Sequence, residues 1–151
     1  TMTITDSKGK EISGSPFTSQ VDGTIVTGKS SPLLGASSAM ILNALKRLAG
    51  LDDSVLLISP EVIKSMQRLK VDYLGYSNPR LYVNEMLVAL SIAANEDPNA
   101  ERAFSKLPEL KGCDVHISVI LTNVNEVSFK KLGMHVSCEP VYQTQSLFHG
   151  N

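Results

Sequence analysis

The sequence contains no tryptophan, only two cysteines and few aromatic residues, which make up 5% of its 151 residues. Cys113 and Cys138 do not form a CxxC pair, and their spacing from the histidines matches no zinc-binding signature. We therefore expect two reduced thiols in a cytoplasmic protein, and no bound metal. No apolar run approaches the roughly 20 residues of a transmembrane helix, and the N-terminal residues do not have the pattern of a signal peptide. A membrane span is not expected.

The sequence also lacks an excess of charge of either sign. Fourteen Lys and Arg residues against fifteen Asp and Glu residues give a formal net charge of −1. A dedicated nucleic-acid-binding protein needs a basic surplus to displace the counterions of phosphates, so no nucleic-acid partner is expected. Hydrophobic residues make up 42% and charged residues 19%, which is typical of a folded globular domain. The chain starts with Thr1 rather than methionine, and we interpret it as a domain of a longer protein.

Four helix starts are predicted by a repeated pair of residues. In each pair a side chain that can cap a helix precedes a proline, which fits the first helical position because its missing N–H needs no partner there. The pairs are Ser31-Pro32, Ser59-Pro60, Asn78-Pro79 and Asp97-Pro98. Apolar residues at helical spacing follow them, and the first helix is expected to end near Gly50.

Strands are predicted between these helices and near both ends. Residues 3–5 and 24–27 are strand formers, and Asp22-Gly23 is a hairpin turn signal. Residues 54–58 form a short, continuously apolar run, which is typical of a strand buried on both faces of a parallel sheet.

The last third of the chain predicts a strand, a helix and a second strand. Residues 114–121 alternate in polarity, Asn123 opens a helix that Gly133 closes, and residues 135–139 alternate again. Such a βαβ unit should have parallel strands.

The predicted fold is a three-layer α/β sandwich with a mostly parallel sheet of four or five strands. Residues 1–26 would form an N-terminal β-hairpin extension, and residues 27–151 the α/β domain, within one domain overall.

Residues 23–30, GTIVTGKS, match the phosphate-loop pattern G-x-x-x-x-G-K-[ST]. The middle residues Thr-Ile-Val-Thr prefer an extended strand to an anion-binding loop, and Pro32 delays the helix beyond Lys29. No predicted strand ends in the aspartate that would hold Mg²⁺. We therefore expect the match to have no nucleotide-binding role of the phosphate-loop type.

A weaker interpretation keeps Lys29, Ser30 and Ser31 as anion ligands near a helix N-terminus. The alternative is an ordinary N-cap beside a solvated lysine. Arg80, at another helix start, either clamps an anion or forms a surface pair with Glu85. No cofactor is identified, and a phosphate or nucleotide is the ligand class that these residues would suit.

Open α/β sheets bind ligands at the carboxyl ends of their strands. The predicted ends lie near Ser59, Asn123 and Glu139, so Asn123 joins the candidate ligand-binding residues. His116 and Glu139 lie on neighbouring predicted strands and could act as a base and its orienting group in a hydrolase. The alternative is a sheet face whose polar side chains are simply solvated.

Several segments together resemble the C-terminal part of a mainly bacterial family known as domain of unknown function eighteen-forty-six, or uncharacterised protein family three-seventy-one. They are TGKS (27–30), LGASSA (34–39), LISP (57–60), NPRL (78–81), ALSI (89–92), GCDVH (112–116), FKKLG (129–133) and CEPVY (138–142). The resemblance runs from about Asp22 to Tyr142. Relatives have His at the position of Tyr82 and Asp at that of Asn84, so any activity that uses those groups is not expected here.

The resemblance implies a longer parent protein with an upstream domain that carries its own phosphate-loop-like segment. Some relatives have been labelled ATP-dependent peptidases, but this chain has neither a zinc-protease motif nor a nucleophile elbow. Three hypotheses follow. The chain is an accessory domain that completes a phosphate or nucleotide site with the upstream domain, a non-catalytic packing or homo-oligomerisation module, or a hydrolase that uses His116 and Glu139.

Overall fold

In a computed structural model, the described residues are 2–5, 26–117 and 123–138. They form four strands and five α-helices, which makes the fold broadly α/β. The strands are β1 (Met2–Thr5), β2 (Val26–Gly28), β3 (Asp114–Ile117) and β4 (His135–Cys138). The α-helices are α1 (Ala36–Leu48), α2 (Pro60–Arg68), α3 (Val83–Ala93), α4 (Pro98–Phe104) and α5 (Asn123–Lys131). A π-helical turn over Leu69–Tyr73 extends α2, and a 3₁₀ turn covers Leu107–Leu110.

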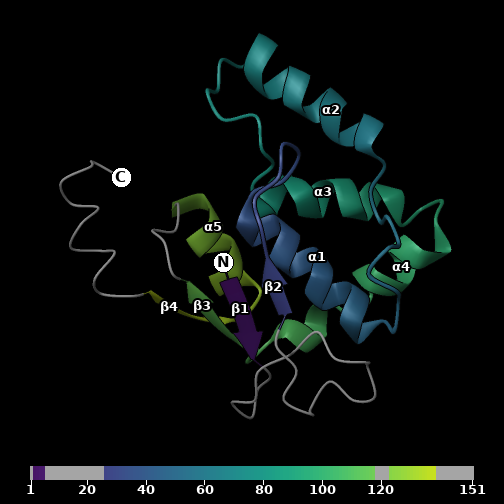
Figure 1. Ribbon diagram of the computed structural model, residues 1–151, viewed down its shortest axis with the longest axis vertical. Helices are drawn as coiled ribbons and strands as arrows, with labels where there is room; N and C mark the ends of the chain where they lie inside the picture. Colours follow the sequence, from purple (N-terminus) through teal and green to yellow (C-terminus); the bar gives the residue numbers. More distant parts are fainter. Residues whose placement is uncertain (1, 6–25, 118–122, 139–151) are drawn as a thin grey trace.

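The strands lie in the order β2-β1-β3-β4 (Figure 1). β1 is antiparallel to both β2 and β3, and only β3 and β4 are parallel. The parallel pairing confirms the predicted βαβ unit of β3, α5 and β4. The expectation of a mostly parallel sheet is wrong for the described strands, because β1 lies inside the sheet and runs opposite to its neighbours.

Helices cover one face of this sheet. Val26 and Val115 point toward them and are buried, whereas Thr27, Asp114 and His116 on the opposite face are exposed. α1 packs on β1 and β2, α5 packs on β4, and α3 lies against α1 and α5. The described ranges contain no second helical layer, so they do not form the predicted three-layer sandwich.

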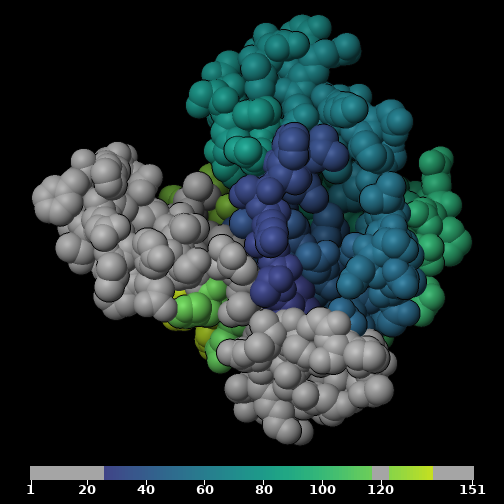
Figure 2. Space-filling model, viewed as in Figure 1, coloured from purple at the N-terminus to yellow at the C-terminus, as the bar shows by residue number. Residues whose placement is uncertain are grey.

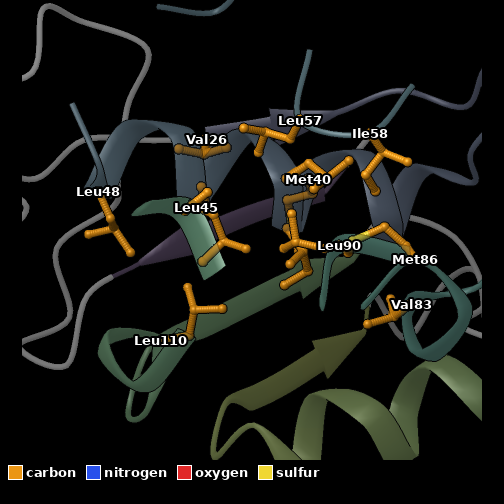
Figure 3. Packing of buried hydrophobic residues seen from close by; sticks show 14 of the residues in the cluster. Val26, Met40, Leu45, Leu48, Leu57, Ile58, Val83, Met86, Leu90 and Leu110 are labelled. Atoms are coloured by element: carbon orange, nitrogen blue, oxygen red, sulfur yellow. The ribbon is translucent and has the colours of Figure 1, made fainter. Parts of the chain in front are cut away.

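The core lies between the sheet and the helices. Met40 and Leu45 of α1 meet Met86 and Leu90 of α3 there, and all four are fully buried (Figure 3). Leu110 joins them from the 3₁₀ turn. Burial of a Leu or Met side chain contributes about 1.5–3 kcal/mol, so this cluster fixes the helices on the sheet.

Two of the four predicted helix starts are confirmed. Ser59 caps α2 by accepting the Glu61 N–H at 3.2 Å, and Asp97 caps α4 by accepting the Asn99 N–H at 2.9 Å. The other two predictions, at Pro32 and Pro79, are wrong by four residues, since α1 begins at Ala36 and α3 at Val83.

Both displaced helices have the same cause. Leu34 and Leu81, each two residues beyond a proline, pair with one another in a parallel β-bridge. The Leu81 N–H donates to the Leu33 carbonyl at 3.1 Å, and the Gly35 N–H donates to the Leu81 carbonyl at 3.4 Å. These long-range bonds hold both segments extended, so each helix starts only after the bridge.

The predicted buried strand over 54–58 is also wrong, since these residues form no strand. Lys46 of α1 donates to the Asp53 carbonyl at 2.8 Å and to the Val55 carbonyl at 3.4 Å, which ties the segment to a helix instead of a sheet. Leu57 and Ile58 enter the core, but Leu56 is 69% exposed. The apolar run therefore contributes to the core as irregular chain and not as a strand.

The turn at residues 52–54 should lose stability in acid. Ser54 donates its backbone N–H to the Asp52 carboxylate at 2.9 Å and its hydroxyl at 2.8 Å, and these bonds hold the pKa of Asp52 below its ordinary value of 3.8. A depressed pKa in the folded state stabilises the fold above pH 3.8, and the effect is lost as the pH falls through the folded value. Asp52→Ala should lower the urea midpoint slightly at pH 6 and by less at pH 3. An equal loss at both pH values would contradict this origin.

Candidate functional site

The bridge between Leu34 and Leu81 brings the N-termini of α1 and α3 together. Ser38, in the first turn of α1, donates its hydroxyl to the Leu81 carbonyl at 2.8 Å and is almost fully buried. Figure 1 shows α1 and α3 meeting at these ends, below the chain that returns from α2. Leu81, fully buried, is therefore the point at which both helices are fixed.

The N-terminus of α5 joins the same place. Asn125, 8% exposed, accepts the Val83 N–H of α3 at 2.9 Å across 42 positions of the sequence. Three helices thus direct their N-terminal ends toward one region. Because each helix N-terminus carries a partial positive charge and N–H groups without intrahelical partners, their convergence favours an anion.

This region lies at the end of the sheet where β2 and β3 finish. Both strands are antiparallel to β1, so they run in the same direction, and β4 is parallel to β3. Helices α1 and α5 follow β2 and β3 along the chain. The geometry therefore agrees with the rule that open α/β sheets bind ligands at the carboxyl ends of their strands.

Two predicted ligand residues are brought into contact here. Arg80 donates its Nε–H to the Ser31 carbonyl at 2.6 Å. Ser31 also caps its own turn, because its Oγ accepts the N–H groups of Leu33 at 3.2 Å and Leu34 at 3.1 Å. The Arg80 side chain is consequently fixed beside the segment that leads from β2 into α1.

Of the other predicted ligand residues, Lys29 and Ser30 lie next to Ser31 in the chain, whereas Asn123 has no hydrogen bond to Arg80 in the described residues. Lys29 and Ser30 are exposed and immediately precede Ser31 in the sequence. Asn123 is the first residue of α5 and is exposed, but no hydrogen bond joins it to Arg80 in the described part of the chain.

The predicted alternative role of Arg80, a surface pair with Glu85, is wrong. Glu85 pairs instead with Lys70, at 2.8 Å between Oε1 and Nζ, and also accepts the Tyr82 N–H at 2.8 Å. Its negative charge, which would compete with an anion at the start of α3, is thus paired with a buried cation.

Lys70 is a buried charged residue beside the candidate site that the sequence did not single out. It is 3% exposed and donates to the Arg80 carbonyl at 2.7 Å as well as to Glu85. Its ammonium group also lies 4.2 Å from the centre of the Tyr82 ring, within range of a cation–π interaction. Lys70 therefore joins the π-helical turn, Arg80 and the start of α3.

A signal for Lys70 was present in the sequence. Ile63, Met66 and Lys70 follow one another at helical spacing, so the lysine occupies the apolar stripe of its helix. A charged residue on such a stripe is almost never fully buried unless it is paired, which predicts a partner.

The exposed face of the sheet carries the candidate hydrolase residue His116. It lies opposite Ser137 on β4, with 3.4 Å between Nδ1 and Oγ, and both are exposed. Glu139, its proposed partner, lies outside the described residues. Within those residues, no group of three His, Cys, Asp or Glu side chains is placed to hold a metal ion.

The chain is thus an α/β domain with three helix N-termini and an arginine at the carboxyl end of its sheet. The family described as domain of unknown function DUF1846, C-terminal, matches residues 13–148. The chain belongs to this family, as the resemblance in its sequence indicates.

Curated relatives carry the name UPF0371 protein. One from Corynebacterium aurimucosum is 50% identical over 143 residues, which cover 94% of this chain and 29% of the relative. One from Corynebacterium urealyticum is 54% identical over 84% of this chain and 26% of its own length. One from Streptococcus thermophilus is 44% identical over 93% of this chain and 29% of its own length. The chain therefore spans less than a third of these relatives.

No helix in the described ranges is both long and apolar enough to cross a membrane.

Proposed function

We propose that this domain is an accessory domain that forms one wall of a binding site for a phosphate group, free or within a nucleotide. The convergence of the α1, α3 and α5 N-termini beside Arg80 carries the proposal. Lys29 and Ser30 would add a cation and a hydroxyl from the exposed segment after β2. We place the protein in the cytoplasm, as expected for a chain with so few cysteines.

The region that precedes this domain in longer relatives would complete the site. More than two thirds of each relative lies outside the matched segment, and the matching family is described as C-terminal. Arg80 and Lys29 are both exposed, so a facing domain could enclose the anion and exclude water from it. Exclusion of water strengthens the attraction between the anion and these cations.

The test compares inorganic phosphate and ATP as ligands of this chain, with amide NMR as the measurement. Changes in amide chemical shift are expected in the first turns of α1, α3 and α5. Saturation should require millimolar phosphate, because this domain alone leaves one side of the site open to solvent. Lys29→Ala should weaken phosphate binding about tenfold, since loss of one charge-assisted contact costs roughly 1.5 kcal/mol. Lys131→Ala, a matched exposed lysine at the far end of α5, should change it less than twofold.

A second measurement tests the contribution of the preceding region. In a hybrid, this chain replaces the matched segment of the C. aurimucosum relative. The hybrid should bind phosphate or ATP more tightly than this chain, and it should lose that gain in Lys29→Ala. If neither the chain nor the hybrid binds either ligand, the proposal fails. In that case, the packing or oligomerisation module becomes the better description.

The hydrolase hypothesis is favoured less. The Ser137 hydroxyl lies within reach of His116. However, the helices whose N-termini lie beside Arg80 cover the opposite face of the sheet, not the face that carries His116. If any hydrolysis were found, an unchanged rate in His116→Ala would end this hypothesis.

A further inference from the structure

Helix α2 and the π-helical turn form an arm over residues 60–73 that stands away from the other helices. Figure 1 shows the arm crossing above α3, and in Figure 2 it lies at the top of the molecule. Gln67 donates to the carbonyl of Pro32 at 2.8 Å, and Lys70 anchors the far end through Arg80 and Glu85. Ile63 is the residue of α2 that is buried in the core.

The apolar stripe of this arm is only half covered. Ile63 and Lys70 are each 3% exposed and face the body of the domain. Val62, Leu69 and Tyr73 lie on a second line along the arm, turned by about 100° from the line of Ile63 and Lys70. These three residues are 42%, 51% and 72% exposed. Contiguous apolar side chains exposed on a helix mark a surface that contacts another element, so the exposed half indicates a missing neighbour.

A hollow between α2 and α3 continues this surface. It has a volume of about 410 Å³, and the exposed apolar residues of its rim are Leu56, Val62 and Ile92. The floor is apolar and is formed by residues of the core or next to it, and Glu96 and Asp97 lie at one end. The hollow therefore suits an apolar segment with a basic residue at the end that meets Glu96.

We propose that this surface, the arm groove, binds the region that precedes this domain in the longer family members. We define the arm groove as Leu56, Val62, Leu69, Tyr73 and Ile92. The proposal rests on the proposed function, because the same region is the one that would complete the anion site. Every relative compared extends far beyond the matched segment, so a domain of this family normally has a large covalent neighbour.

Continuity with the anion site supports this occupant. Beyond the hollow, exposed apolar side chains continue along the arm to Tyr73, and the next residues, with Leu74 and Tyr76 both exposed, lead to Arg80. One neighbour lying along the arm would therefore cover the groove and reach the cations. The charges of α2 are mixed, with Glu61 facing solvent as well as basic residues, which does not favour an anionic lipid surface.

Cysteine labelling of this chain and of the hybrid tests the arm groove. Ile92→Cys and Val62→Cys, in this chain and in the hybrid, are exposed to a thiol reagent, and each labelled peptide is measured by mass spectrometry. Both cysteines should react at least about tenfold more slowly in the hybrid than in this chain. Ser105→Cys, an exposed position after α4 outside the groove, should react at the same rate in both.

A disruptive variant links protection to the groove. Leu56→Asp in the hybrid should return the labelling of Ile92→Cys toward its rate in this chain, whereas Val127→Asp, on α5, should not. Equal rates in chain and hybrid would overturn the proposal. If the labelling of this chain slows as its own concentration rises, the surface binds a second copy of the chain. If anionic vesicles slow the labelling, the surface binds a membrane. Both results would also overturn it. Phosphate binding is measured separately, so either proposal can fail alone.

Discussion

Replacement of Gly28 by alanine should destabilise this domain strongly, because the added methyl group would clash with the backbone of α1. A Cβ atom at Gly28 would lie 2.7 Å from the Cα of Met40 and closer still to the Met40 nitrogen and the Ala36 carbonyl oxygen. All three are backbone atoms of α1, so they cannot move without shifting the helix off the sheet. Overpacking of this kind costs about 1–3 kcal/mol, and we expect the upper end because no side chain can yield.

Thermal unfolding followed by circular dichroism measures the effect. A loss near 3 kcal/mol corresponds to a fall in melting temperature of roughly 6–12 °C for a domain of this size. Gly35→Ala is the matched control, since its Cβ would meet only the Leu81 carbonyl oxygen, at 3.7 Å, and its φ of −70° suits any residue. Gly35→Ala should change the melting temperature by no more than a few degrees. Equal effects of the two substitutions would contradict the close packing of β2 on α1.

The Gly28 variant also separates two interpretations of GTIVTGKS. In a phosphate loop the glycine before the lysine lets the backbone approach a phosphate, so alanine would weaken binding and leave the fold intact. Here Gly28 ends a strand, and α1 starts only at Ala36, well beyond Lys29. The prediction from the sequence that Thr-Ile-Val-Thr favours a strand is confirmed for its described part, Val26 and Thr27.

The elements that the sequence predicted correctly are those that depend on residues close to them in the chain. Ser59 and Asp97 cap the helices that follow them, and Gly133, with a φ of +83°, closes α5 as expected. The βαβ unit was predictable because alternation and a capping signal fall within one short stretch of chain. Such features need no knowledge of distant residues.

Long-range pairing explains most of the wrong predictions. Nothing near Leu34 indicates that it pairs with Leu81, and this bridge delays two helices and creates the candidate anion site. Likewise, β1 separates β2 from β3, which no local pattern could show. The anion site could be predicted only as separate residues, because its assembly depends on Leu81 and Asn125, whose roles are tertiary.

Lys70→Met should be the most damaging substitution of a charged residue in the described part of the chain. The methionine keeps the length of the side chain but removes the donor to the Arg80 carbonyl and the cation paired with Glu85, whose Oε1 keeps only the Tyr82 N–H. Removal of one partner from a buried ion pair costs about 3–5 kcal/mol, and we expect roughly 2–3 kcal/mol because the Glu85 side chain is 23% exposed. Lys64→Met, an exposed lysine of the same helix, should cost less than about 0.5 kcal/mol.

A double-mutant cycle identifies the source of this loss. Urea unfolding is measured for Lys70→Met, Glu85→Gln and the double variant, in each case with the Tyr82 N–H still able to bond to the side-chain oxygen at position 85. Because the double variant leaves no unpaired charge, it should be more stable than the sum of the single losses predicts, by about 1 kcal/mol or more. Strict additivity would mean that the loss in Lys70→Met does not come from its pairing with Glu85. Because Lys70 also bonds to the Arg80 carbonyl, Lys70→Met should weaken phosphate binding at temperatures where the protein is still fully folded, whereas Lys64→Met should not.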